Sequence, residues 1–358
     1  MADSASKAFR VAIVGGGLAG VVLGIGLQKY GISFHIYEAA PSFGEIGAGV
    51  NFGPNTIRAL AGISAEVLEA FYKHASFNDP SVPASSYLYI RRGDPASDPP
   101  FAKRFNVPGQ VQTLYGMTIP TRSCVHRARF LNEIAQLLSS ESTSFKKALT
   151  SIEEHENGET TLQFADGTTV TANVVIGCDG IRSTVRQYLY QGQVVPSYTG
   201  DYGYRAMVPR EAFEAAFGRE ISISGSLFIN QGGYIITYPL ESGTVINALA
   251  VCCRPDEPWE HETWLAPSTP EEILKDLERW HPELQKIFST YGSKDRWAIF
   301  DLPHDKPYFR GRLCLIGDSA RKQSLGFPHP FHICFEFLSS ERLRQEAFRI
   351  LMYSKGVY

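Results

Sequence analysis

The chain has 358 residues, of which 44% are hydrophobic, enough to build a large core in two domains or one elaborate domain. Its net charge of −3 at pH 7 excludes the strongly basic balance that a nucleic-acid or anionic-membrane partner requires. The six cysteines form no CxxC pair and show no metal-ligand spacing, so we expect reduced thiols in a cytoplasmic protein, with no metal site.

An apolar stretch near the N-terminus, residues 11–27, is long enough to suggest a membrane anchor. It contains six glycines, however, and glycine is a poor helix former. A strand, a tight turn and a helix explain it better. Nothing else approaches membrane length, so we expect a soluble protein without a membrane partner.

The first predicted elements form a nucleotide-binding unit. The run VAIV at 11–14 is apolar throughout, as in a strand buried on both faces. Gly15, Gly17 and Gly20 then spell GxGxxG. The first glycine permits the tight turn, the second admits a pyrophosphate, and the third lets the helix pack close to the strand.

The helix that follows, at about 18–30, offers its N-terminal amides to phosphates, and Gly31 is placed to cap its end. A second strand, ISFHIYE, ends on Glu38, at the spacing of an acid that binds the adenosine ribose. The pattern predicts a dinucleotide site but does not separate FAD from NAD.

Further along, a helix starts at 126 with Phe130, Leu131, Ile134, Leu137 and Leu138 on one face. The stretch 160–170 predicts a hairpin around Asp166 and Gly167. Other predicted strands are YLYIRR, ANVVIGCDG, GYRAMV, SLFIN, YIITYPL and TVINALAVC, the first being the one strand expected between 80 and 120.

A capping box at Thr269 to Glu272 starts a late helix with Ile273, Leu274, Leu277 and Trp280 on one side. Three histidines, His126, His281 and His304, have no partner at ligand or triad spacing. We interpret them as surface or turn residues.

These elements predict an α/β fold: a Rossmann-like, glutathione-reductase-like nucleotide domain with an inserted, mainly β substrate domain. The absence of a clean linker predicts a discontinuous arrangement. We assign the FAD-binding domain to 1–80, 120–192 and 300–358, and the substrate-binding sheet domain to 81–119 and 193–299.

Three spaced motifs carry a family resemblance: the N-terminal GxGxxG, GCDGIRSTVR at 177–186, and GRLCLIGDSA at 311–320. In this order they resemble flavin-dependent aromatic monooxygenases of the salicylate-hydroxylase and 4-hydroxybenzoate-hydroxylase type, over residues 8–320. The resemblance implies FAD as cofactor and NAD(P)H as co-substrate.

The resemblance also implies roles for single residues. Glu38 would bind the adenosine ribose, and Gly49 would lie near the flavin end. Arg127 would contact the ribityl and pyrophosphate region, while Asp318 would hydrogen-bond the ribityl chain. Asp179 would shape the groove that FAD and NADPH share.

The middle of the chain is similar to fungal monooxygenases that hydroxylate phenolic polyketides. In that subgroup an arginine and a tyrosine face the substrate, and they map to Arg205 and Tyr238. Flavin oxygen transfer is electrophilic, so a guanidinium that stabilises a phenolate would activate the ring, and a tyrosine hydroxyl can bond the same oxygen. From the residues alone, a solvent-facing arginine and a core tyrosine stay open alternatives.

The resemblance ends after Ala320. Arg321 stands where the family has a histidine. The family's glycine-rich turn and C-terminal helices are not recognisable in the tail of this sequence. One hypothesis is a retained intron or frameshift at 321. The other is a true short variant whose tail forms an amphipathic helix with Leu343, Ala347, Ile350 and Leu351 on one face.

We therefore expect an FAD-dependent monooxygenase that uses NAD(P)H and O2 to hydroxylate a phenolic small molecule in fungal polyketide metabolism. Its expected partners are that aromatic substrate and O2, and a homodimer stays open. The alternative is a truncated, non-catalytic remnant with weak FAD binding. A flavin halogenase is disfavoured because the four tryptophans never form WxWxI.

Overall fold

The computed structural model describes residues 9–44, 49–95, 104–108, 112–114 and 117–321. The expectations for the tail beyond Arg321 lie outside these residues.

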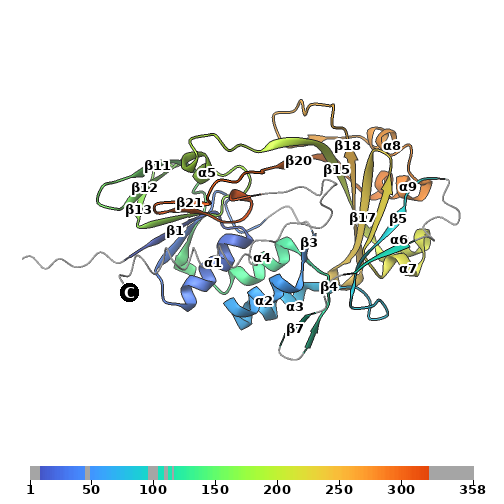
Figure 1. Cartoon of the computed structure of the whole chain (residues 1–358), viewed down its shortest axis with the longest axis horizontal. Helices are drawn as coiled ribbons and strands as arrows, with labels where there is room; N and C mark the ends of the chain where they lie inside the picture. The colour runs from blue at the N-terminus through green and yellow to red at the C-terminus, as the bar shows by residue number, and fades with distance from the viewer. Residues whose placement is uncertain (1–8, 45–48, 96–103, 109–111, 115–116, 322–358) are drawn as a thin grey trace, which may run out of the picture.

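A six-stranded sheet forms the centre of one half of the molecule, at the left of Figure 1. Its order is β10-β2-β1-β14-β22-β21, and every pairing is parallel except that of the edge strand β21. The strands are β1 (Val11–Val14), β2 (Phe34–Tyr37), β10 (Thr143–Ser144), β14 (Val174–Gly177), β21 (Phe309–Arg310) and β22 (Leu313–Leu315). The strands β1, β14 and β22 are fully buried, which explains why their sequences are continuously apolar.

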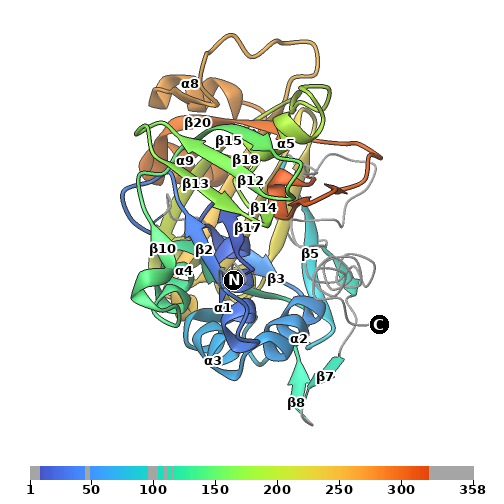
Figure 2. The ribbon, with the colours of Figure 1, turned by 90° about the vertical axis from the view of Figure 1, so that its left-hand side faces the viewer.

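Different layers cover the two faces of this sheet. Helices pack against one face, into a core that includes Val11 and Ile13. They are α1 (Leu18–Lys29), α2 (Pro54–Ile63), α3 (Ala65–His74) and α4 (Arg127–Ala135). The other face, with Ala12 and Val14, packs against a three-stranded meander and α5 (Thr184–Leu189) (Figure 2). The meander strands are β11 (Leu149–Glu154), β12 (Thr160–Phe164) and β13 (Thr169–Ala172).

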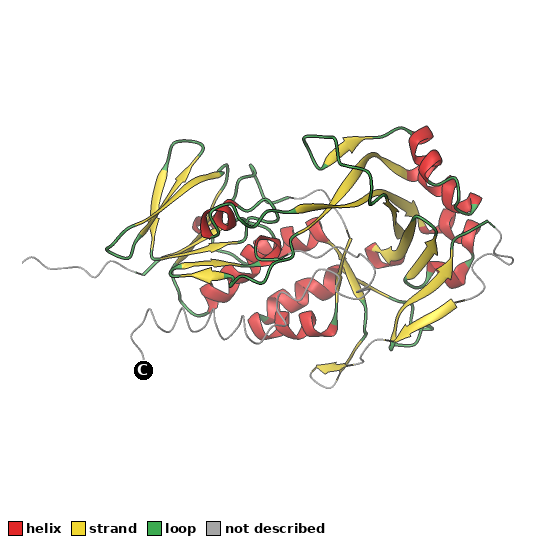
Figure 3. Cartoon of the chain, turned by 45° about the horizontal axis from the view of Figure 1, so that its top comes forward, coloured by secondary structure: helices red, strands yellow, loops and turns green. Residues whose placement is uncertain are grey.

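The other half of the molecule is an eight-stranded sheet in the order β19-β20-β15-β18-β17-β16-β5-β6. Its strands are β5 (Ser86–Arg92), β6 (Arg104–Pro108), β15 (Ser197–Pro209), β16 (Ser226–Asn230), β17 (Gly233–Leu240), β18 (Val245–Cys253), β19 (Leu265–Pro267) and β20 (Gly292–Asp301). Helices cover its outer face (Figure 3). These are α6 (Arg210–Phe217), α7 (Arg219–Ser222), α8 (Pro270–Asp276) and α9 (Pro282–Tyr291).

A small sheet, β3-β9-β4, lies where the two halves meet (Figure 1). Its strands are β3 (Gly49–Phe52), β4 (Ala75–Phe77) and β9 (Ser123–His126). Cys124 of β9 packs against Ile236, Tyr238 and Leu240 of β17, so this sheet covers the inner face of the large one. A separate hairpin joins β7 (Gln112–Leu114) and β8 (Met117–Ile119), and short 3-10 turns lie at Ser140–Ser142, Glu241–Gly243 and Gly317–Ser319.

Several local predictions are confirmed. Gly31 follows the end of α1 with φ +65°, while its N–H bonds Gln28 O and the N–H of Ile32 bonds Leu27 O, the two bonds of a Schellman motif. The Asp166–Gly167 turn joins β12 to β13. Thr269 and Glu272 form the predicted capping box of α8.

Other local predictions were wrong. Leu274 is 38% exposed, and α8 ends at Asp276, so Trp280 lies in the following turn, where it packs on Gly93. The helix from 126 ends at Ala135, before Leu137 and Leu138. Three strands between 104 and 119 were missed, because composition there is dominated by turn-forming residues.

The predicted fold class is confirmed: a nucleotide-binding α/β half is combined with a largely β half. The chain crosses between the halves more than once, since β5 belongs to the large sheet and β9 and α4 return to the first half. The exact domain boundaries stay a prediction. No helix in the described part of the chain is long and apolar enough to cross a membrane.

Candidate functional site

Four predicted cofactor residues lie at one edge of the six-stranded sheet. Gly15 follows β1, Glu38 follows β2, Asp179 comes shortly after β14, and Asp318 comes shortly after β22. These four strands are parallel neighbours, so their carboxyl ends lie side by side. The fold thereby brings together motifs that are far apart in the sequence. They meet at the edge where ligands of open α/β sheets bind.

The glycines of the first motif are required by close backbone packing. Gly15 has φ +105°, and a Cβ at Gly15 would lie 2.4 Å from the carbonyl oxygen of Cys178. A Cβ at Gly20 would lie 2.0 Å from Gly15 O. Gly17 is the N-cap of α1 and supplies no side-chain cap, so the first turn presents backbone amides to an anion.

Glu38 is held in place by two backbone amides. Its Oε2 accepts from Gly16 N at 2.5 Å, and its Oε1 accepts from Ala40 N at 2.7 Å. The carboxylate is thereby fixed beside the glycine turn. Each oxygen keeps further acceptor capacity, which a pair of ribose hydroxyls can use.

The two carboxylate oxygens of Asp179 differ in their hydrogen bonding. Its Oδ2 accepts from Thr184 N at 2.8 Å and Val185 N at 3.2 Å, at the start of α5. Its Oδ1 is buried and has no hydrogen-bond partner in the described structure. Burial raises the pKa of the Asp179 carboxyl, despite hydrogen bonds that lower it.

The third motif packs against the other two. Gly317, with φ +80°, approaches Ala19 in the first turn of α1, where a Cβ on Gly317 would lie 3.4 Å from Ala19 Cβ. Ser319 Oγ donates to Gly177 O at 2.6 Å. Asp318 stands between Gly317 and Ser319 in the chain and is half-buried.

Gly49 and Arg127 lie together at a second place, in and next to the small sheet. Gly49 pairs with His126 across β3 and β9, and Arg127 follows directly as the first residue of α4. The hydroxyl of Tyr238 donates to Gly49 O at 3.1 Å. The predicted flavin-end glycine thus contacts a predicted substrate residue.

Arg205 and Tyr238 share one face of the large sheet. Arg205 pairs with Leu249 and Tyr238 pairs with Asn247, two residues along the same strand, so both side chains project to the same side. This inner face also carries Trp297, which pairs with Gly203. The opposite face carries Tyr204 and Ala206 and packs against the helices.

The inner face holds buried polar atoms without partners among the described residues. Arg205 Nε, Trp297 Nε1 and Asn247 Oδ1 are all of this kind. The Arg205 guanidinium lies 5.5 Å from the centroid of the Trp297 ring. Burial lowers the pKa of Arg205 and raises the pKa of Tyr238 well above its usual range, so Tyr238 stays a neutral phenol. Unsatisfied groups gathered on one face are typical of a ligand site.

Sequence reasoning missed two buried arginines. Arg186 is fully buried, and its guanidinium donates to the carbonyls of Val194, Ser319 and Ile181. Arg122 is 3% exposed and lies over the Tyr238 ring. Arg186 stands inside the GCDGIRSTVR motif, which could have indicated it. Arg122 precedes a short strand in a stretch without a helix or strand period to mark it.

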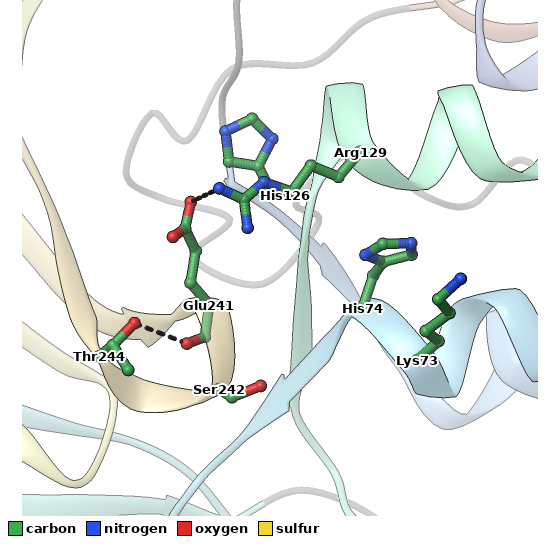
Figure 4. A pocket seen from close by; sticks show the side chains of 7 residues that line it. All are labelled: Lys73, His74, His126, Arg129, Glu241, Ser242 and Thr244. Carbon is green, nitrogen blue, oxygen red and sulfur yellow. Dashed lines mark hydrogen bonds and ion pairs between the residues drawn. The ribbon is translucent and has the colours of Figure 1, made fainter.

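The three histidines are half-buried, and two of them, His281 and His304, lie in connecting segments outside the helices and strands. His281 Nδ1 accepts from Glu283 N and caps α9. His304 Nε2 lies 2.5 Å from Ala320 O. His126 lines a polar pocket of about 200 Å³ with Lys73, Arg129 and Glu241 (Figure 4).

Ion pairs inside and beside this pocket offset its cations. Arg129 bonds Glu241 at 3.1 Å, and Lys73 bonds Glu133 at 2.6 Å. The pocket therefore has little net charge to attract an anion. We assign it no ligand.

Comparison with known proteins places the chain among flavoproteins. The FAD binding domain family matches residues 8–324. The chain is 33% identical over 339 residues to the dual trans-enoyl reductase/FAD-dependent monooxygenase tazHJ of Aspergillus terreus, covering 92% of this chain and 45% of that protein. It thus spans less than half of that relative's length.

Two further matches, one of sequence and one of structure, cover most of this chain. Salicylate hydroxylase of Pseudomonas putida is 32% identical, with 87% of this chain and 71% of that protein covered. A solved salicylate hydroxylase substrate complex superimposes with a TM-score of 0.70 and 27% identity, over 88% of this chain and 74% of that chain.

The described residues fit the cofactor of these relatives. The turn at Gly15 leaves no room for a side chain, the first turn of α1 has no side-chain cap, and Glu38 is fixed beside both. Such a cradle suits a pyrophosphate and an adjoining ribose. FAD is the cofactor, and the chain belongs to the family of FAD-binding aromatic monooxygenases that includes salicylate hydroxylase.

Proposed function

We propose that this protein uses NAD(P)H and O2 to hydroxylate a phenolic small molecule. One observation carries the proposal: Arg205 has a buried, unsatisfied Nε and shares a sheet face with Tyr238, which bonds Gly49 O. Gly49 is the residue that the family resemblance puts at the flavin end. A phenol bound beside Arg205 would therefore lie where FAD delivers oxygen.

Within this proposal, the cofactor residues keep the roles that their positions support. Gly15, Gly17 and Gly20 form the pyrophosphate turn, and Glu38 receives the adenosine ribose. Arg127 and Asp318 hold the middle of the cofactor. Asp179, with its unsatisfied Oδ1, borders the groove toward NAD(P)H. When bound and reduced, FAD supplies an electrophilic oxygen atom derived from O2.

Arg205 activates the substrate ring. A guanidinium stays protonated even when burial lowers its pKa, so it stabilises the phenolate over the neutral phenol. The phenolate ring donates electrons far more readily to an electrophile. Trp297, beside the guanidinium, orients it and limits access of water.

We expect Tyr238 to bond the phenolic oxygen of the substrate, which as a phenolate can only accept a hydrogen bond. In the described structure the single hydroxyl proton of Tyr238 is donated to Gly49 O. The tyrosine positions the ring between the large sheet and β3. It can donate to the substrate oxygen only by releasing the Gly49 carbonyl.

The relatives' names and the residues of this site together support a phenolic substrate. Salicylate hydroxylase is a relative that covers most of this chain, and a fungal FAD-dependent monooxygenase is another. We propose a phenolic substrate of polyketide origin, as in fungal secondary metabolism.

Replacing Arg205 tests this proposal. Arg205→Met keeps the length and the apolar stem but removes the charge. It should retain FAD and lose hydroxylation by at least about 100-fold in kcat. Arg205→Lys should recover part of the hydroxylation rate, because lysine restores the positive charge but not the paired N–H donors of the guanidinium. Hydroxylation by the FAD-loaded methionine variant at the wild-type rate would remove Arg205 from the mechanism.

A further inference from the structure

Arg122 is a second buried cation beside the proposed substrate site. It lies just before β9 and is 3% exposed. Gly225 leaves the space that its guanidinium occupies, because a Cβ at Gly225 would lie 1.9 Å from Arg122 Nη1. The guanidinium lies 4.8 Å from the centroid of the Tyr238 ring.

The charge of Arg122 is not balanced within the part of the chain that the structure describes. Its Nη2 is buried and has no hydrogen-bond partner there, and no carboxylate of that part pairs with it. The ring of Tyr238 compensates a buried guanidinium only partly. A buried, unpaired charge is destabilising, and an anion bound beside it offsets that penalty.

Arg122 and Arg205 act on the same tyrosine. Both cations lower the pKa of Tyr238 against the larger effect of burial, so both lie close to its ring. Arg205 approaches from β15 of the large sheet, and Arg122 from the residue that directly precedes β9 of the small sheet. Two like charges close to one aromatic ring repel each other, and a ligand that brings negative charge to both relieves this repulsion.

We propose that Arg122 is a specificity-determining residue that binds a second anionic group on the substrate, a carboxylate carried by the same ring as the phenolic oxygen bound at Arg205. The inference rests on the proposed function, because it assigns the phenolic oxygen to Arg205. It predicts that the enzyme prefers phenolic acids over neutral phenols of the same shape.

A matched pair of probes separates charge from shape. 2,4-Dihydroxybenzoate and 2,4-dihydroxybenzamide differ in the charge of one substituent and little in size. Binding of each is measured by the change in flavin absorbance of the FAD-loaded protein. Wild type should bind the acid more tightly than the amide by about 10- to 100-fold, as for a charge-assisted bond.

Two variants then assign this preference to Arg122. Arg122→Met should reduce affinity for the acid about 10- to 100-fold and leave the amide within about threefold. Arg122→Lys should keep most of the preference. With an acid that is turned over, Arg122→Met should raise KM more than it lowers kcat, whereas Arg205→Met should lower kcat.

Other outcomes overturn the inference without touching the proposed function. Equal loss of acid and amide binding in Arg122→Met would show a structural role only. An unchanged preference for the acid would place the carboxylate elsewhere, and failure of wild type to bind the acid would exclude a carboxylate site. The proposed function fails separately, if no phenolic compound in a panel of acids, amides and neutral phenols yields hydroxylated product.

Discussion

The hydroxyl of Tyr238 donates a 3.1 Å hydrogen bond to the carbonyl oxygen of Gly49, a residue 189 positions earlier. The bond joins β17 of the large sheet to β3 of the small sheet. It therefore fixes the proposed substrate-facing side of the large sheet to β3, the strand that we propose lies at the flavin end of the cofactor. Changes on either side of this bond should alter turnover before they alter folding.

Gly49→Ala should displace Tyr238. A Cβ at this position would lie 2.7 Å from Tyr238 Oη and 2.8 Å from Cε2, so the ring must move and lose its bond. We expect turnover to fall at least about tenfold, with a loss of about 1–3 kcal/mol in the free energy of unfolding.

Two variants serve as comparisons for Gly49→Ala. Gly62→Ala adds a methyl group where nothing lies within 4 Å and should leave turnover unchanged. Tyr238→Phe removes the hydroxyl but keeps the ring in place. It should reduce turnover less than Gly49→Ala does, because the added methyl group of Gly49→Ala displaces the whole ring. Full activity of Gly49→Ala would show that the contact does not position Tyr238.

Arg186→Met should strongly destabilise the fold around the second and third motifs. Three backbone carbonyls, of Ile181, Val194 and Ser319, would lose the guanidinium that they accept from. We expect the free energy of unfolding to fall by about 3–5 kcal/mol in urea titrations.

Arg182→Met is the matched control from the same loop. Arg182 is exposed and lies 4.5 Å from the centroid of the Trp264 ring, so its loss should change stability by about 1 kcal/mol or less. Equal effects of the two variants would contradict the role given to Arg186.

Asp179→Asn should change how stability depends on pH. Burial raises the folded-state pKa of Asp179 above its ordinary 3.8, so the neutral acid favours the folded state at low pH. That contribution is full below 3.8 and is lost as the pH rises through the raised pKa. Asparagine stays neutral and can still accept from Thr184 N and Val185 N.

The apo forms of wild type and Asp179→Asn should therefore be compared by urea unfolding from mild acid to neutral pH. The stability of the asparagine variant relative to wild type should increase as the pH rises. A relative stability that decreases over this range would mean that the Asp179 carboxylate is favourably placed in the fold.

Glu38→Gln should weaken FAD binding. Both carboxylate oxygens accept from backbone amides, and a glutamine would turn its NH2 group toward one of these donors. We expect FAD affinity to fall about tenfold or more in equilibrium dialysis. Glu153→Gln, on a side chain that is 75% exposed, is the control and should bind FAD as wild type does.

The sequence could predict the parts of this molecule that depend on local patterns. Gly15, Gly20 and Gly31 are needed by turns and close packing that a short stretch encodes, and Thr269 with Glu272 forms a cap within one helical turn. The ordered motifs also indicated which strand ends would meet, since parallel strands bring Glu38, Asp179 and Asp318 to one edge.

The inner face of the large sheet could not be predicted in the same way. Trp297 and Asn247 reach it from separate strands, and only the strand register shows that they share it. Arg122 reaches it from the segment before β9 and lies over the Tyr238 ring. The bond from Tyr238 to Gly49 is equally non-local. Trp280 was misplaced because a helical period was extended past Asp276, the end of a short helix.

The most direct test of the central claim is oxygen transfer by the FAD-loaded protein. The protein is supplied with NAD(P)H, ¹⁸O2 and a panel of salicylic and resorcylic compounds, and the products are examined by mass spectrometry. The account predicts a ring-hydroxylated product that carries one ¹⁸O atom for each NAD(P)H consumed. A folded protein that does not bind FAD, or that binds it and forms no labelled product with any of these compounds, would contradict it.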